Sequence, residues 1–338
     1  MTQPPRAVVF AYSEVGARCL GTLYECGWDV PLVVTHEDDP HERRWFASVA
    51  ATARAAGSRV LTPEEPTDTA LAHELAALQP DFIFSFYYRR MLPAAVLRAA
   101  TRGALNMHGS LLPKYRGRAP VNWAVLHGET ETGASLHYMV ERPDAGALVD
   151  QERVPIGPDD TAFEVAQRVA DAAVVVLRRS LPALLAGTAP ARPLDLAQGS
   201  YFGGREPADG EFSLDWPAAR IHDLVRAVAP PFPGAFTHLH GHELRVHRSA
   251  RDTAPARHVA LGPCLYADER GLVAECGDGR RLRLIEAWLA GAPLDVARLL
   301  ATFGPTPIVA AARGTPATHV PGTRPAPLAK SARPCRRS

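Results

Sequence analysis

The feature that most constrains the fold is an alternation of short β-branched apolar runs with segments of helical composition. Strands that alternate with helices form βαβ units, whose strands lie parallel in a sheet covered on both faces. The predicted fold class is therefore α/β, with a Rossmann-like, doubly wound, mostly parallel sheet. The predicted strands are 7–11, 30–35, 60–61, 81–86, 104–107 and 134–140, and the predicted helices are 15–26, 42–56, 69–78, 94–100 and 161–186.

The pattern changes after the last of these helices, for which we expect Asp159 or Asp160 as N-cap and Gly187 as the stop signal. An amphipathic segment and evenly spaced alternating runs follow, which is typical of a small antiparallel β-barrel (OB-like). The runs are 235–239, 244–247, 271–276 and 282–286, after a helix at 215–227. We predict a first domain at 1–193, a linker at 194–207, the small barrel at 208–302, and a disordered Pro/Ala/Arg-rich tail at 303–338.

Charge and composition exclude several classes of protein. Lys plus Arg is 37 and Asp plus Glu is 36, so a net charge of +1 gives no overall attraction to nucleic acid or to an anionic membrane. No apolar run approaches the roughly 20 residues of a membrane span, and the N-terminus does not resemble a signal peptide. We therefore expect a cytoplasmic protein. The five cysteines form no Cys-x-x-Cys pair, so neither a disulfide framework nor a zinc site is predicted.

The strongest chemical signal lies at the end of the strand predicted at 104–107. Asn106 and His108 are two residues apart, so in an extended segment their side chains point to the same side. An amide N–H can stabilise a developing oxyanion, and an imidazole can accept a proton near neutral pH. This pair suits acyl transfer to an amine.

Asp144 lies in a loop marked by Pro143 and Gly146, and a carboxylate near an imidazolium stabilises it and orients the ring. Other interpretations stay open from the residues alone. An Asn-x-His pair is often a structural hydrogen-bonded pair, and an aspartate in a turn often forms an Asx-turn. The spacing does not determine whether the two segments meet.

The segment Asn106-x-His108-x-Ser110-Leu111-Leu112-Pro113, with a distant Asp144-x-Gly146, resembles the folate-dependent formyltransferase family. The resemblance extends over about 8–207 and more weakly to about 300. It implies that Asn106, His108 and Asp144 are catalytic and that 10-formyltetrahydrofolate is the co-substrate, with no metal and no NAD. It also implies a set of folate contacts, which are Arg90, Met91, Leu92, Arg118, Val140, Glu141, Arg142, Pro143 and Asp144.

Within that family, four stretches are similar to the enzymes that formylate UDP-4-amino-4-deoxy-L-arabinose. They are 9–12, 35–40, 84–89 and 114–123. The resemblance implies a sugar-nucleotide acceptor and a role in lipid A modification and polymyxin resistance. Lys114, Arg116 and Arg118 supply local positive charge for an anionic folate tail and sugar nucleotide.

Several alternatives remain. Methionyl-tRNA formylation would favour a basic surface, and the barrel region contains Arg245, His247, Arg248 and Arg251. A formyltetrahydrofolate hydrolase would use water as the acceptor. A dinucleotide-binding reductase is disfavoured because Gly16 and Gly21 do not form Gly-x-Gly-x-x-Gly. A non-catalytic folate-binding module would not need all three polar residues. The sequence leaves the oligomeric state open, and a homo-oligomer is one alternative.

Overall fold

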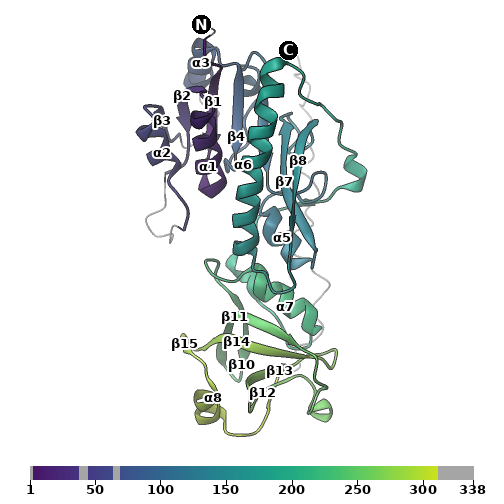
Figure 1. Ribbon diagram of the computed structural model, residues 1–338. Coiled ribbons are helices and arrows are strands. Elements are labelled where there is room, and N and C mark those ends of the chain that lie inside the picture. The colour runs from purple at the N-terminus through teal and green to yellow at the C-terminus, as the bar shows by residue number, and fades with distance from the viewer. Residues whose placement is uncertain (1–2, 38–44, 64–68, 311–338) are drawn as a thin grey trace, which may run out of the picture.

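The computed structural model describes residues 3–37, 45–63 and 69–310 of the chain. It contains two seven-stranded sheets, and helix α7 (Ala218–Ala227) lies between them (Figure 1). Among the described residues, none of the helices combines the length and the apolar character that crossing a membrane requires.

The first sheet has the strand order β3-β2-β1-β4-β5-β7-β8. Its first five strands in this order are parallel, and β7 and β8 are antiparallel additions. The predicted α/β fold with a mostly parallel sheet is confirmed. The strands are β1 (Arg6–Ala11), β2 (Asp29–Val34), β3 (Arg59–Leu61), β4 (Phe82–Phe86), β5 (Gly103–His108), β7 (Glu131–Tyr138) and β8 (Leu148–Pro155).

Helices cover both faces of this sheet, as a buried parallel sheet requires. Helices α1 (Ser13–Glu25) and α6 (Ala162–Ala186) pack against each other on one face, and α3 (Thr69–Leu78) and α4 (Ala94–Leu97) lie on the other. Successive side chains of a strand point to opposite faces. Strand β1 therefore contributes Val9 to the first core and Phe10 to the second, and both are fully buried.

The long helix α6 begins at Ala162, one residue later than predicted, and its N-cap differs from the two predicted residues. Its N-cap is Thr161, whose side chain accepts a hydrogen bond from Glu164 N–H, while the Glu164 side chain accepts one from Thr161 N–H. Asp160 is used differently, because its carboxylate accepts Gly157 N–H and pairs with Arg168. The prediction of Asp159 or Asp160 as the cap is therefore wrong. Gly187 ends the helix with a left-handed φ of 71°, as expected.

Two other predicted helices are shorter in the structure. Helix α2 spans only Val49–Ala55 and begins where the Ser48 side chain accepts Ala51 N–H, and residues 42–44 lie outside the described residues. Helix α4 ends at Leu97 instead of residue 100. The sequence also gave no prediction for α5 (Pro120–Leu126), for β8, or for the short paired strands β6 (Arg116–Gly117) and β9 (Tyr201–Phe202).

The second sheet is antiparallel throughout, with the order β10-β11-β14-β13-β12-β16 and β15 beside β14. It forms a half-barrel whose concave core packs against α7, which confirms the predicted small C-terminal β-domain. The strands are β10 (Ala235–Leu239), β11 (His242–Asp252), β12 (Cys264–Asp268), β13 (Gly271–Glu275), β14 (Arg281–Leu289), β15 (Ala292–Pro293) and β16 (Ile308–Val309).

The end of this domain corrects the predicted tail. Phe303 is the last residue of helix α8 (Val296–Phe303), and Ile308 in β16 pairs with Leu265 of β12. Ile308 is buried, because its apolar side chain completes the core of the half-barrel. The described part of the chain therefore extends past the predicted start of the tail to residue 310, and the remainder of the predicted tail, 311–338, lies outside the described residues.

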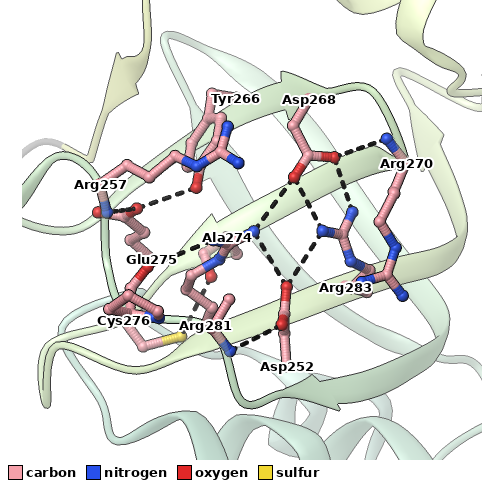
Figure 2. Close-up of polar contacts among 12 residues, drawn as sticks. Asp252, Arg257, Tyr266, Asp268, Arg270, Ala274, Glu275, Cys276, Arg281 and Arg283 are labelled. Atoms are coloured by element: carbon pink, nitrogen blue, oxygen red, sulfur yellow. Dashed lines mark hydrogen bonds and ion pairs between the residues drawn. The ribbon is translucent and has the colours of Figure 1, made fainter.

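The face of this sheet opposite the main core carries a cluster of buried ion pairs (Figure 2). Asp268 on β12 accepts hydrogen bonds from Arg281 and Arg283 on β14 at 2.8–3.1 Å. Asp252 on β11 lies 3.0 and 3.1 Å from the same two guanidinium groups. Strand β11 is the neighbour of β14, and β13 lies between β14 and β12, so the cluster ties β11, β12 and β14 together across β13.

Candidate active site

The site begins at the carboxyl end of β5. Leu105 and Met107 point into the core beneath α1 and α6, so Asn106 and His108 share the opposite side of the strand. His108 is buried and Asn106 is half-buried. The prediction that these two side chains converge is confirmed, because both point toward the same carboxylate.

That carboxylate is Asp144, in the loop between β7 and β8. Its Oδ1 lies 3.4 Å from Asn106 Nδ2 and 3.7 Å from His108 Nδ1, and its Oδ2 accepts Gly117 N–H at 2.8 Å. Asp144 has a left-handed φ of 49°. The nearby Gly146 is required sterically, because a Cβ there would lie 1.9 Å from the Tyr138 carbonyl oxygen. The loop therefore folds back on β7 and brings the two predicted segments together.

His137 is a fourth member of the site, which the sequence analysis missed. Its register on β7 places it opposite Asn106 on β5, and its Nε2 lies 3.2 Å from Asn106 Nδ2 and 3.6 Å from Asp144 Oδ1. The Nδ1–H of His137 donates to the Tyr138 carbonyl at 2.8 Å, so a neutral ring presents Nε2 as an acceptor to the Asn106 amide. The histidine in the predicted strand at 134–140 was the available signal, but the sequence did not give the register.

The charge of Asp144 follows from its neighbours. Burial raises the pKa of this carboxyl, but the charges that His108 and His137 carry when protonated, the hydrogen bond that a protonated His137 donates and the Gly117 N–H outweigh burial and hold the pKa well below its ordinary value. Asp144 is therefore ionised at neutral pH. It can stabilise a positive charge that forms on an imidazole.

The structure shows which of Ser110 and the neighbouring cations are buried and which face solvent. Ser110 is fully buried and its hydroxyl donates to the Lys114 carbonyl at 2.6 Å, which leaves it no role as a nucleophile. Arg116 is buried, whereas Lys114 and Arg118 are exposed. Of the three cations expected to supply local positive charge, only two face solvent.

The predicted folate contacts lie on three segments, after β4, after β6 (Arg118) and after β7. Leu92 is buried and packs in the same core as Met139, while Met91 and Val140 expose 57% and 46% of their surface. His36, which the sequence analysis did not single out, stacks on Tyr88 and accepts Arg89 N–H at 3.1 Å. Burial and the charges of Arg89 and Arg90 lower the pKa of His36 to about 4, so its ring is neutral at pH 7.

A small pocket of about 110 Å³ is lined by the polar residues Asn122, Arg205 and Glu206 and by apolar residues that include Val228 and Phe232. The Arg205 guanidinium lies 5.0 Å from the Trp123 ring, and its Nε and Nη1 are buried without a hydrogen-bond partner among the described residues. The segment before Arg205 is linked to Asp144 through main-chain pairing. Strand β9, which precedes Arg205, pairs with β6, and β6 contains the Gly117 that binds Asp144.

Comparison with known proteins identifies the family. Residues 6–181 match the family model described as formyl transferase, and residues 205–304 match the model of the formyl transferase C-terminal domain. The chain belongs to the formyl transferase family. It is therefore an enzyme that transfers formyl groups, and the resemblance seen in the sequence is confirmed at the level of the family.

Solved structures show the same fold as this formyltransferase. An N-formyltransferase from Helicobacter canadensis, in complex with folinic acid and dTDP-3-aminofucose, is 18% identical with a TM-score of 0.66, over 83% of this chain and 99% of that one. WlaRD, a sugar 3N-formyl transferase studied with dTDP and 5-N-formyl-THF, is 15% identical with a TM-score of 0.62, over 83% and 97% of the two chains.

HypX from Aquifex aeolicus, in complex with tetrahydrofolic acid, is 18% identical with a TM-score of 0.60. The match covers 89% of this formyltransferase but 48% of HypX, so the chain corresponds to about half of that protein. At these identities the likeness establishes the shared fold. The roles of the individual side chains depend on the geometry described above.

Proposed function

We propose that this formyltransferase moves the formyl group of 10-formyltetrahydrofolate to the amine of a sugar nucleotide. The observation that carries the proposal is the convergence of Asn106, His108 and Asp144 at the end of a buried strand. Formyl transfer to an amine needs a donor for the oxyanion and an acceptor for the amine proton. An amide and an imidazole beside an ionised carboxylate supply both.

In the proposed reaction, the amine nitrogen attacks the formyl carbon and the bond from that carbon to N10 of the folate breaks. Asn106 Nδ2–H donates to the oxygen that becomes negative, which typically contributes about 10²–10³ in kcat. His108 accepts the proton that the amine loses and returns it to N10 of the departing tetrahydrofolate, which contributes about 10²–10⁴. Asp144 stabilises the imidazolium between these two steps.

The proposed folate contacts remain Arg90, Met91, Leu92, Arg118 and the loop 140–144. Two exposed apolar side chains, Met91 and Val140, support this assignment, because a flat pterin ring would cover them. The buried packing of Leu92 with Met139 supports it further, since it brings the two contact segments to one place. Arg118 is exposed and can pair with the anionic folate tail.

The pocket around Arg205 is the proposed site for the acceptor's phosphates. Guanidinium N–H groups that are buried without partners fit an anion, and a sugar nucleotide carries a diphosphate. Two similar structures contain dTDP or a dTDP-amino sugar, which also supports a nucleotide acceptor. Strand β9, which precedes this pocket, pairs with β6, whose Gly117 binds Asp144, and this link also supports an acceptor site here.

We further propose UDP-4-amino-4-deoxy-L-arabinose as the acceptor, as in the formyltransferase domain of the bifunctional polymyxin-resistance protein ArnA. The support is the likeness of the stretches 9–12, 35–40, 84–89 and 114–123 to those enzymes. In this role the formylated product would serve lipid A modification.

The experiment is to measure tetrahydrofolate release from 10-formyltetrahydrofolate with UDP-4-amino-4-deoxy-L-arabinose, with a dTDP-3-amino sugar, with methionyl-tRNA and without an acceptor. We expect release only with the UDP sugar. Release with the dTDP sugar alone would replace the proposed sugar, and release only with methionyl-tRNA or only with water would contradict sugar formylation. The His108→Ala variant should be inactive with every acceptor, and its melting temperature shows that the protein is folded.

A further inference from the structure

The main-chain carbonyl of Tyr115 determines how His108 can hold its protons. His108 Nε2 lies 2.8 Å from this oxygen, and a carbonyl oxygen can only accept a hydrogen bond. Nε2 therefore keeps its hydrogen, and Nδ1 is the nitrogen that is free to gain or lose a proton. Nδ1 is also the nitrogen that faces Asp144, at 3.7 Å from Oδ1.

Tyr115 presents this carbonyl from an unfavourable backbone conformation. Its φ is 56°, in the left-handed region that bulky residues rarely adopt. Such a conformation persists only where the surroundings impose it, and it is frequent at functional sites. The surroundings of Tyr115 therefore control the position of the carbonyl, and through it the orientation of the His108 ring.

Three contacts hold Tyr115 in place. Its hydroxyl donates to Glu129 Oε1 at 2.9 Å, its N–H donates to Ser200 Oγ at 2.8 Å, and its ring stacks on Phe202 with centroids 5.3 Å apart. Burial, together with the hydrogen bond and charge of Glu129, raises the pKa of Tyr115, so the hydroxyl remains a donor. Tyr115 is buried, and its contacts reach it from two separate segments of the chain.

Two of these contacts come from the segment 200–205, which leads into the Arg205 pocket. The same segment binds the main chain on either side of the site, because Arg116 N–H donates to the Ser200 carbonyl and Arg118 N–H donates to the Phe202 carbonyl, both at 3.0 Å. A Cβ at Gly117 would lie 2.1 Å from the Phe202 oxygen, so the main chains of these two segments are in direct contact. A change in this segment would therefore reach His108 through Tyr115.

We propose that Tyr115 is a positioning residue that fixes Nδ1 of His108 as the nitrogen that carries the transferred proton, and that segment 200–205 sets this geometry. The second part deepens the proposed function, since it links the acceptor pocket to the proton-transferring side chain. Tyr115 acts through His108 and does not itself need to touch either substrate.

The first test is independent of the acceptor. The ¹⁵N NMR shifts of the two His108 ring nitrogens, assigned by comparison with His108→Ala, report which nitrogen is protonated in the neutral ring of the full-length protein. We expect the proton on Nε2. A neutral ring protonated on Nδ1 would overturn the proposal, whatever the enzyme's acceptor proves to be.

The second test removes single contacts to Tyr115. Ser200→Ala deletes the acceptor of its N–H, and Tyr115→Phe deletes the hydroxyl bond to Glu129 while the ring remains. The control is Ser213→Ala, because Ser213 Oγ also accepts a main-chain N–H, from Asp215, away from the site. Formyl transfer is measured with whichever acceptor supports turnover.

We expect Ser200→Ala to lower kcat by about 10-fold, since a misplacement of about 1 Å can cost on the order of 100-fold, with KM for 10-formyltetrahydrofolate nearly unchanged. Tyr115→Phe should lower kcat by less, and both variants should show mixed His108 tautomers. Ser213→Ala should match the wild type. Wild-type kcat and an unchanged tautomer in both Ser200→Ala and Tyr115→Phe would overturn the proposal that segment 200–205 sets the geometry of His108. A loss confined to KM for the acceptor would also contradict it, since it would assign these residues to binding alone.

Discussion

Asp144, in a loop beside the first sheet, and Asp268, in the second sheet, are both largely buried carboxylates, but their partners differ in kind. Asp144 faces two imidazoles and an amide at 3.4–3.7 Å, and accepts one main-chain N–H. Asp268 faces two guanidinium groups at 2.8–3.1 Å (Figure 2). The first carboxylate has loosely placed partners, whereas the second has close hydrogen bonds with good geometry.

The protonation chemistry of the partners explains the difference. Hydrogen bonds from Arg283 lower the pKa of Asp268 despite its burial, and arginine stays charged at any physiological pH. That pair therefore has one protonation state and serves structure. An imidazole can gain and lose a proton near neutral pH, so the pairing of Asp144 with histidines suits proton transfer. A permanent charge stabilises a fold, whereas a changeable one allows catalysis.

The two regions also differ in backbone conformation, which is regular around Asp268 and strained around Asp144. Asp268 lies on β12 in a regular antiparallel ladder. Asp144 lies in a loop with positive φ, and Tyr115 and Ala119 near it also have positive φ. Strained backbone of this kind costs of order 1–3 kcal/mol per residue and collects at functional sites. In the first region, strained backbone holds the chemical groups in place.

The largest effect should come from removing the negative charge of Asp144, for which we propose a catalytic role. Asp144→Asn keeps the shape and can still accept Gly117 N–H, but it removes the charge that stabilises the imidazolium. We expect kcat for formyl transfer to fall by about 10³-fold, with a melting temperature close to that of the wild type. The comparison between the two regions would fail if turnover remained at the wild-type level.

The matched change in the second region should affect stability instead. Asp268→Asn leaves Arg281 and Arg283 with one carboxylate, Asp252, and we expect the free energy of unfolding to fall by about 3 kcal/mol, since breaking a buried ion pair is costly. Chemical denaturation measures this loss. Activity per folded molecule should be unchanged, and a 10³-fold loss of kcat in this variant would show that the two clusters are not separate in function.

A smaller effect should appear in acid. The pKa values of Asp252, Asp268 and Glu275 are all lower in the folded protein than their ordinary values near 4. Their contribution to stability is therefore complete above about pH 5 and is lost as the pH falls from about 4 toward the folded pKa values. Denaturation curves between pH 6 and pH 3 test this. Asp268→Asn should lose less stability over this interval than the wild type, and equal losses would show that Asp268 does not contribute.

The sequence by itself determined the α/β class, because the period of an apolar pattern follows directly from how a strand or helix buries its side chains. It also determined the chemical identities of Asn106, His108 and Asp144, and the same-side placement of the first two, since a strand has a period of two. Local signals were less reliable where several residues compete for one role. Thr161 caps α6 although two aspartates precede it, because the Asp160 carboxylate is used by Gly157 N–H and Arg168.

Only the tertiary structure decided what surrounds those three residues. The position of His137 depends on the register between β5 and β7, and that of Asp144 on a loop that folds back over β7. The contact of Tyr115 with His108, and the approach of segment 200–205 to both, joins parts of the chain 85 residues apart. Contacts between residues distant in sequence depend on the packing of the whole chain, so a pattern of neighbouring residues identifies the chemical groups but does not place them together.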